Sequence, residues 1–156
     1  MITLRDLQEV ITRSIYDSQE FTDLSIALVG KKLNFYKDAS VARFDEILPY
    51  LVTHKFNKVT EFYKDDEWIL QIIIGIVSDE SYTEVNGINE YQSTNTVEEL
   101  ADLAMKVANE ELRCFGVNGE MNVYILGYNV LITEIGESEN TQGIVTFTVS
   151  QESLIG

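Results

Sequence analysis

The spacing of apolar residues at the start of the chain is typical of an amphipathic helix. Thr3 can cap this helix, and Asp6 lies in its first turn, where the helix dipole favours a carboxylate. The apolar stripe indicates that the helix packs on another element. Its positions are Leu4, Leu7, Val10, Ile11, Ser14 and Ile15. A weaker pattern predicts a short helix from about Asp23 to Val29, capped by Thr22 and ended by Gly30.

Strand patterns follow these two helices. A short strand is expected at Leu33–Tyr36, and side chains then alternate with a period of two from Tyr50 to Phe56, after Pro49. We expect Lys64–Glu67 to be a hairpin turn. Trp68–Val77 is apolar on both faces, which predicts a central strand that is covered on both sides. Helices can cover one face, and a neighbouring subunit can cover the other.

The second half begins with a polar segment, 78–95, which we interpret as a long loop. Within it, Asn86-Gly87 is a turn signal. Thr96 is expected to cap a helix with Glu98 and Glu99 in its first turn, and Gly116 is expected to stop it. The stripe of this helix is Leu100, Leu103, Ala104, Val107, Ala108 and Leu112.

The remaining residues predict antiparallel strands. Met121–Ile135 is rich in strand-forming residues, and Gly127 marks either a bulge or a turn between two short strands. Gly136–Gly143 is expected to be a polar hairpin loop, and Val145–Ser150 alternates as a last strand. The order of elements predicts one α+β domain over 1–156, with a single antiparallel or mixed sheet packed against an N-terminal and a central helix.

The charge of the chain is large and unevenly distributed. The 156 residues include 26 acidic and 11 basic side chains, for a net charge of −15. Residues 1–78 carry 12 acidic and 9 basic side chains, whereas residues 79–156 carry 14 and 2. This balance argues against an extended nucleic-acid-binding face and against docking on an anionic membrane. The acidic half either keeps the protein soluble, or repels an anion, or attracts a basic partner.

The sequence shows no recognisable motif for catalysis or for ligand binding. His54 is the only histidine and Cys114 the only cysteine, and both are interpreted as packed side chains, so no intrachain disulfide is expected. One His and one Cys make a zinc site within a single chain improbable, and no phosphate-binding glycine motif is present. The start of the chain has no signal-peptide pattern, and its longest apolar run is far shorter than the ~20 residues of a membrane span. We therefore expect no enzyme activity, cofactor or metal.

Two groups of residues remain as candidate interaction surfaces. Aromatic residues around the first hairpin turn and in the segment 78–95 are either a satellite cluster under a neighbouring loop or a subunit or partner interface. They are Phe56, Phe62, Tyr63, Trp68, Tyr82 and Tyr91. Acidic residues of the second half are candidates for a channel lining or a partner surface. They are Glu98, Glu99, Asp102, Glu110, Glu111, Glu137 and Glu139.

The order of elements resembles that of the tail terminator (tail completion) proteins of long-tailed bacteriophages. The corresponding stretches are Ile2–Asp17, then Leu48-Pro49-Tyr50-Leu51-Val52 with Glu67–Val77, then Val97–Arg113 and Asn129–Ser150. The Leu-Pro-Tyr entry into the first long strand and the final strand are also similar to that family. The absence of a catalytic constellation agrees with it as well.

The resemblance implies a structural virion protein, assembled in the host cytoplasm and located at the head-proximal end of the tail. Family members form hexameric rings that stop polymerisation of the tail tube and present a surface to the head connector. The implied partners are therefore further copies of the chain, the tail tube protein and a head-completion or connector protein, while the free chain can be a monomer. An acidic lumen would let DNA pass without specific binding.

Other functions stay open. Secretion chaperones are small, acidic, dimeric α+β proteins with a similar order of elements, although they usually close with a helix. Another phage neck or connector protein is a further alternative, as is an enzyme that uses carboxylates alone. Size separates the first two classes, because two chains of 17.7 kDa give about 35 kDa and six give about 106 kDa.

Overall fold

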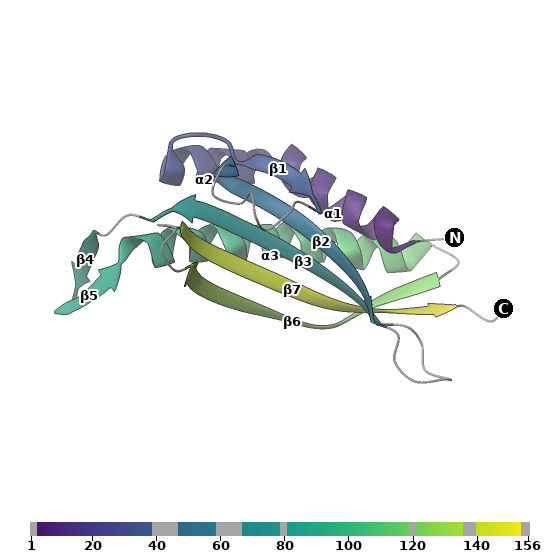
Figure 1. Cartoon of the computed structure of the whole chain (residues 1–156). Helices are drawn as coiled ribbons and strands as arrows, with labels where there is room; N and C mark the ends of the chain where they lie inside the picture. The colour runs from purple at the N-terminus through teal and green to yellow at the C-terminus, as the bar shows by residue number, and fades with distance from the viewer. Residues whose placement is uncertain are drawn as a thin grey trace.

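The computed structural model describes residues 3–38, 47–58, 67–78, 81–118, 121–135 and 140–153. Five strands of the described chain form one sheet in the order β1-β2-β3-β7-β6, and two form a separate hairpin, β4-β5 (Figure 1). Strand β1 is parallel to β2, and the other neighbours in the large sheet are antiparallel. The predicted α+β class and mixed sheet are confirmed. The elements are α1 Leu4–Asp17, α2 Gln19–Val29, β1 Asn34–Lys37, β2 Tyr50–Lys58, β3 Glu67–Val77, β4 Tyr82–Val85, β5 Ile88–Tyr91, α3 Gln92–Asn118, β6 Met121–Ile135 and β7 Asn140–Ser153.

Helix α1 has the cap and the buried stripe that its sequence predicts. The Thr3 hydroxyl accepts a hydrogen bond from the Asp6 N–H at 3.1 Å, and the Asp6 carboxylate accepts one from the Thr3 N–H at 2.9 Å. This capping box satisfies two backbone N–H groups that have no partner within the helix. Leu7, Ile11 and Ile15 are fully buried, so the stripe faces the core.

Helix α2 begins earlier than its apolar pattern predicts. Its N-cap is Ser18, whose hydroxyl accepts a hydrogen bond from the Phe21 N–H at 3.2 Å, so the predicted cap, Thr22, lies inside the helix. The error arose because one serine ends α1 and starts α2. Gly30 does end the helix as predicted, with a left-handed φ of 84° that glycine adopts without strain.

The main core lies between one face of the large sheet and the three helices, which stand behind the strands in Figure 1. Strand β3 is central, as its two apolar faces predict, with β2 on one side and β7 on the other. The sheet contributes Leu51, Leu70, Ile72, Ile74, Ile76, Val145 and Phe147 to this core. At β7, Gly143 lets α3 approach closely, because a Cβ there would overlap the side chain of Val97.

The segment 78–95 is not a long loop. Most of it forms the β4-β5 hairpin, whose turn at Asn86-Gly87 has φ values of 53° and 82°. Helix α3 then starts at Gln92, so Thr96 is a buried helical residue rather than a cap, and Glu98 and Glu99 lie beyond the first turn. The helix also continues to Asn118, past the predicted stop at Gly116.

Two long strands, β6 and β7, close the sheet. Met121–Ile135 is one strand with a register shift between Ile125 and Gly127, so the glycine marks a bulge and not a turn. Strand β7 begins at Asn140, so residues 140–143 of the predicted loop 136–143 belong to the strand, and residues 136–139 lie outside the described residues. The predicted hairpin turn at 64–67 lies outside the described residues, except for Glu67, the first residue of β3.

Candidate interaction surfaces

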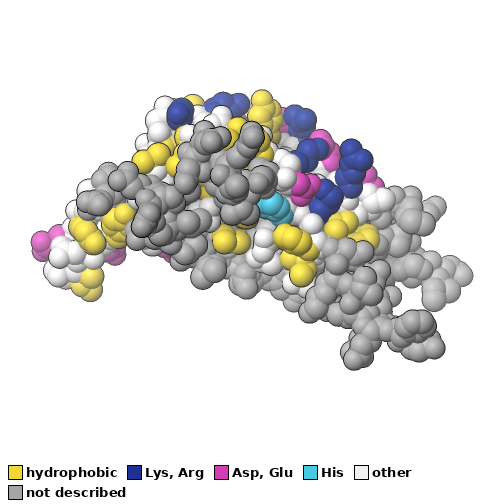
Figure 2. All heavy atoms as spheres, in the orientation of Figure 1, with side chains coloured by type: hydrophobic (Ala, Val, Ile, Leu, Met, Phe, Trp, Pro, Cys, Tyr) yellow, Lys and Arg dark blue, Asp and Glu magenta, His cyan; other side chains and the backbone are white. Residues whose placement is uncertain are grey.

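The helices cover one face of the large sheet only. No described helix lies on the other face, which we therefore call the uncovered face, although Tyr50 and Val52 at one end of it are buried. This face is turned toward the viewer in Figures 1 and 2. Residues directly opposite in antiparallel strands share a face, so the register places four rows there. The rows are Tyr50, Gly75 and Gln142; Val52, Ile73 and Ile144; His54, Gln71 and Thr146; and Phe56, Ile69 and Thr148. The first two rows include a small buried cluster of Tyr50, Val52 and Ile73.

Toward the other end of these rows, the uncovered face exposes an aromatic side chain. Phe56 is 47% exposed and stacks on the His54 imidazole, with ring centroids 6.0 Å apart and an interplanar angle of 12°. Burial lowers the pKa of His54, the nearby charge of Lys55 lowers it further, and Asp38 partly opposes this. His54 is therefore neutral at neutral pH, and it presents an apolar ring face beside Phe56.

Of the four aromatic residues predicted around the first turn, the structure describes two, Phe56 and Trp68, and they lie on opposite faces of the sheet. Trp68 packs against the main core, whereas Phe56 lies on the uncovered face. Their separation follows from the register, in which Trp68 is paired with Asn57 and Ile69 with Phe56, because successive residues of a strand alternate between faces. Phe62 and Tyr63 lie outside the described residues. Phe56 is thus the described member of that group that is available to a partner.

The β4-β5 hairpin projects from the end of the molecule at which α3 begins (Figure 1). Tyr82 and Tyr91 are paired across it, with ring centroids 5.4 Å apart. Tyr82 is 65% exposed and Ile88 is 67% exposed, and Val85 is exposed beside Ile88. Exposed apolar side chains that cluster in this way are typical of interaction sites.

The acidic candidates of α3 are all exposed: Glu98, Glu99, Asp102, Glu110 and Glu111. Helix α3 packs on the covered face of the sheet, so its exposed carboxylates and the exposed Phe56 ring lie on opposite sides of the sheet. Glu137 and Glu139 lie outside the described residues. In the described part of the chain, no group of three or more His, Cys, Asp or Glu side chains could hold a metal ion.

A polar network that the sequence analysis missed joins α1 to the sheet. The Gln8 side chain is 1% exposed; its amide donates to the Thr53 carbonyl oxygen at 3.0 Å and to the Asp38 carboxylate at 3.1 Å. The Lys55 ammonium donates to Gln8 Oε1 at 2.9 Å and also to Asp38. Burial raises the pKa of Asp38, but the hydrogen bonds from Lys55 and Gln8 and the Lys55 charge outweigh it, so the net shift is downward.

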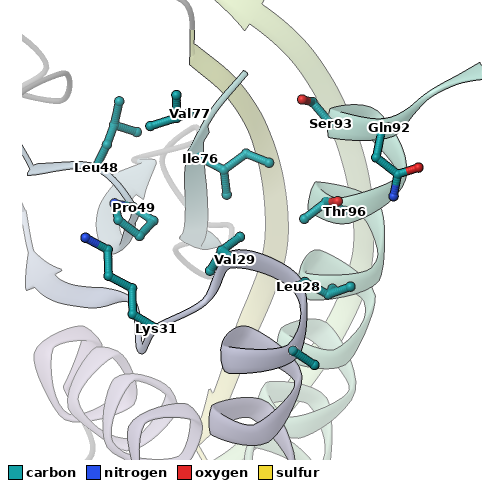
Figure 3. A pocket seen from close by; sticks show the side chains of 11 residues that line it. Leu28, Val29, Lys31, Leu48, Pro49, Ile76, Val77, Gln92, Ser93 and Thr96 are labelled. Carbon is teal, nitrogen blue, oxygen red and sulfur yellow. The ribbon is translucent and has the colours of Figure 1, made fainter. Parts of the chain in front are cut away.

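A pocket of about 440 Å³ opens where the end of α2, the start of β2, the end of β3 and the start of α3 meet (Figure 3). Its walls combine aliphatic side chains with the Lys31 ammonium and the polar side chains of the first turns of α3. The residues are Ala27, Leu28, Val29, Lys31, Leu48, Pro49, Ile76, Val77, Gln92, Ser93 and Thr96. This lining includes no carboxylate, imidazole or thiol.

A second concavity, of about 340 Å³, lies along α1 and β1. The Tyr16 ring is part of its lining and makes an edge contact with Phe35, with ring centroids 5.3 Å apart. The Lys32 ammonium lies 4.8 Å and the Arg13 guanidinium 5.4 Å from the centroid of the Tyr16 ring. Lys37 pairs with Glu9, which lowers the pKa of that carboxyl group. We call this aromatic and basic surface the α1–β1 edge; sequence spacing could not reveal it because α1 and β1 are separated along the chain.

Among known proteins, similarity to this chain is found in solved structures. No protein-family model matches the sequence, and no curated protein matches it. A solved structure described as "Virion of native gene transfer agent (GTA) particle" contains a chain that aligns with 94% of this chain and 95% of its own length, at 13% identity and a TM-score of 0.44. None of the helices in the described residues has the length and apolar character needed to cross a membrane.

Proposed function

We propose that this chain is a structural virion protein that forms a ring at the head-proximal end of a bacteriophage tail tube. In this role it ends polymerisation of the tube and provides the surface that joins the head. Its partners are further copies of itself, the tail tube protein and a head-completion or connector protein. The protein has no catalytic role and no cofactor in this proposal.

The observation that carries the proposal is the order of the elements on one half-covered sheet. An N-terminal helix, the β2-β3 hairpin, the central helix α3 and the closing pair β6-β7 follow in the order that tail terminators share. The helices cover one face, and Phe56 is exposed on the other. A protein that functions by contact with several others needs such a surface, because burial of apolar area drives association.

The exposed carboxylates of α3 also have a function in this proposal. We propose that they border the passage of DNA, where like charge prevents phosphates from binding. An image of the assembled ring with α3 on its outer wall would contradict this part of the proposal alone.

Deletion of the gene from the phage or prophage that encodes the chain tests the function directly. We expect tails with overlong tubes that are not joined to heads, because nothing would stop polymerisation. Tails of normal length, joined to heads, would contradict the proposal.

Complementation of the deletion with variants tests the contribution of the uncovered face. Phe56→Ser should fail to restore virions, whereas Ile26→Ser should restore them. These two residues are equally exposed, at 47% and 48%, but Ile26 lies on helix α2. Light scattering on the purified protein separates the main alternative, because a stable dimer of about 35 kDa, two chains of 17.7 kDa, favours a secretion chaperone.

A further inference from the structure

The β4-β5 hairpin is an arm without a core of its own. Seven of its eight strand residues are exposed, and only Tyr91 is partly buried. An isolated two-stranded hairpin is at best marginally stable in water, so an arm of this kind gains from a surface on which to pack. It carries Glu84 and Glu90 and no basic residue, for a local charge of −2.

The α1–β1 edge has complementary chemistry. Arg13, Lys32 and Lys37 against Glu9 give its lining and flanking side chains a net charge of +2. Tyr16 and Tyr36 are exposed there, which offers rings to the apolar side chains of the arm. Strand β1 is also an edge strand of the described sheet. The Asn34 N–H donates to the carbonyl oxygen of Pro49, just before β2, and the Asp38 N–H donates to that of Thr53 in β2. By alternation the backbone groups of Phe35 and Lys37 point away from β2.

We propose that the β4-β5 arm of one copy of this chain docks on the α1–β1 edge of a second copy. The exposed Tyr16 and Tyr36 would be covered by Val85 and Ile88 from the arm tip and by Tyr82 and Tyr91 from its base. Glu84 and Glu90 would meet the basic side chains of the edge. Such matched charges steer association and fix its register. Figure 2 shows the acidic side chains of the arm at one end of the molecule and basic side chains along the α1 and β1 border.

This contact is head-to-tail, because the arm and the edge are different surfaces. Repetition of a head-to-tail contact produces a ring where the rotation closes, and a filament where it does not. The inference deepens the proposed function, since it names the two surfaces that would join neighbouring subunits of the ring, and it rests on that proposal for its biological setting.

A charge-exchange experiment tests the contact with the purified full chain. The arm variant carries Glu84→Lys and Glu90→Lys, and the edge variant carries Arg13→Glu and Lys32→Glu, so each variant has an arm and an edge of like charge. Sedimentation velocity should show concentration-dependent assembly of the original chain, an at least tenfold weaker association of each variant alone, and recovery in an equimolar mixture. Added salt should weaken the association of the original chain.

Lys31→Glu is the matched control. Lys31 lies next to Lys32 in the sequence, but it lines the other pocket, so this variant should assemble as the original chain does. Ile88→Ser should weaken assembly without lowering the melting temperature, because Ile88 is exposed. Circular dichroism shows that each variant is folded.

The inference would be overturned if the original chain stayed monomeric at about 1 mM, a concentration at which even a contact of millimolar Kd is populated. It would also be overturned if the variants assembled as the original chain does, or if the mixture of variants did not recover assembly. Rings formed by the arm variant alone would overturn the inference and leave the proposed function standing. Arm-dependent assembly of a protein whose gene is dispensable for normal tails would support the inference and contradict the proposed function.

Discussion

The ring of Tyr50 lies over the backbone of Gly75. The two residues are directly paired between β2 and β3, and a Cβ at position 75 would overlap the Tyr50 ring and hydroxyl. The Tyr50 hydroxyl then accepts a hydrogen bond from the side-chain amide of Gln142, which is paired with Gly75 from the other side. The glycine therefore lets an aromatic ring lie across the central strand and reach a third strand.

We predict that Gly75→Ala destabilises the protein by about 1–3 kcal/mol, the usual cost of overpacking a core. Urea unfolding measures this free energy. The loss should be much smaller in a Tyr50→Leu background, because the shorter side chain leaves room for the new methyl group. Equal losses in the two backgrounds would show that the ring is not the cause.

Removal of the buried amide of Gln8 should also destabilise the protein. In Gln8→Leu the Thr53 carbonyl oxygen, the Asp38 carboxylate and the Lys55 ammonium each lose one hydrogen bond and keep another partner. We expect a loss of about 1.5–3 kcal/mol, the scale of hydrogen bonds to charged groups. Gln19→Leu is the control, because Gln19 is exposed and its amide bonds only to Asp23 among the described residues. A change within about 0.5 kcal/mol, the range of most surface substitutions, is expected there.

The stability contribution of Asp38 should depend on pH in one direction. The pKa of its carboxyl group is lower in the folded chain than its ordinary value of 3.8. The advantage of the original chain over Asp38→Asn should therefore be complete above that value and decline as pH falls through the folded-state pKa. Asn tolerates the left-handed φ of 55° at this position, so the comparison isolates the charge.

Unfolding of both chains at several pH values measures this advantage. In a Lys55→Met background the pH dependence should largely disappear, since Lys55 is the main group that lowers this pKa. An unchanged dependence in that background would contradict the assignment.

The tyrosine pair should stabilise the hairpin and not the body of the protein. We expect Tyr82→Ala to speed amide hydrogen exchange in β4 and β5, because an aromatic pair contributes about 0.5–1.5 kcal/mol. The melting temperature should stay unchanged, since the ring is 65% exposed and lies outside the main core. A lowered melting temperature would mean that the hairpin folds together with the sheet.

The sequence of the β4-β5 hairpin contains a turn signal that hydrophobic alternation does not capture. Asn-Gly between two short segments with a valine or isoleucine next to the turn is a strong hairpin signal. Hydrophobic alternation predicts a loop here because the two strands have no buried face, and alternation detects strands only where one face is buried.

Elements whose signals are local were predictable from the sequence. The capping box of Thr3 and Asp6, the left-handed end of α2 at Gly30 and the alternation of β2 depend on contacts within a few residues or on the side-chain period of one element. The starts of α2 and α3 were not predictable from apolar spacing, because the first turn of each helix is fixed by polar residues outside the stripe.

The functional surfaces were decided by the tertiary structure. Gln8, Asp38 and Lys55 form one network only because α1, β1 and β2 meet, and Phe56 and Trp68 separate only because the register assigns them to opposite faces. By itself the sequence determined the α+β class, the central position of β3 and the acidity of the second half. It could not determine which faces stay uncovered, because exposure depends on how distant elements pack, and no local pattern encodes that packing.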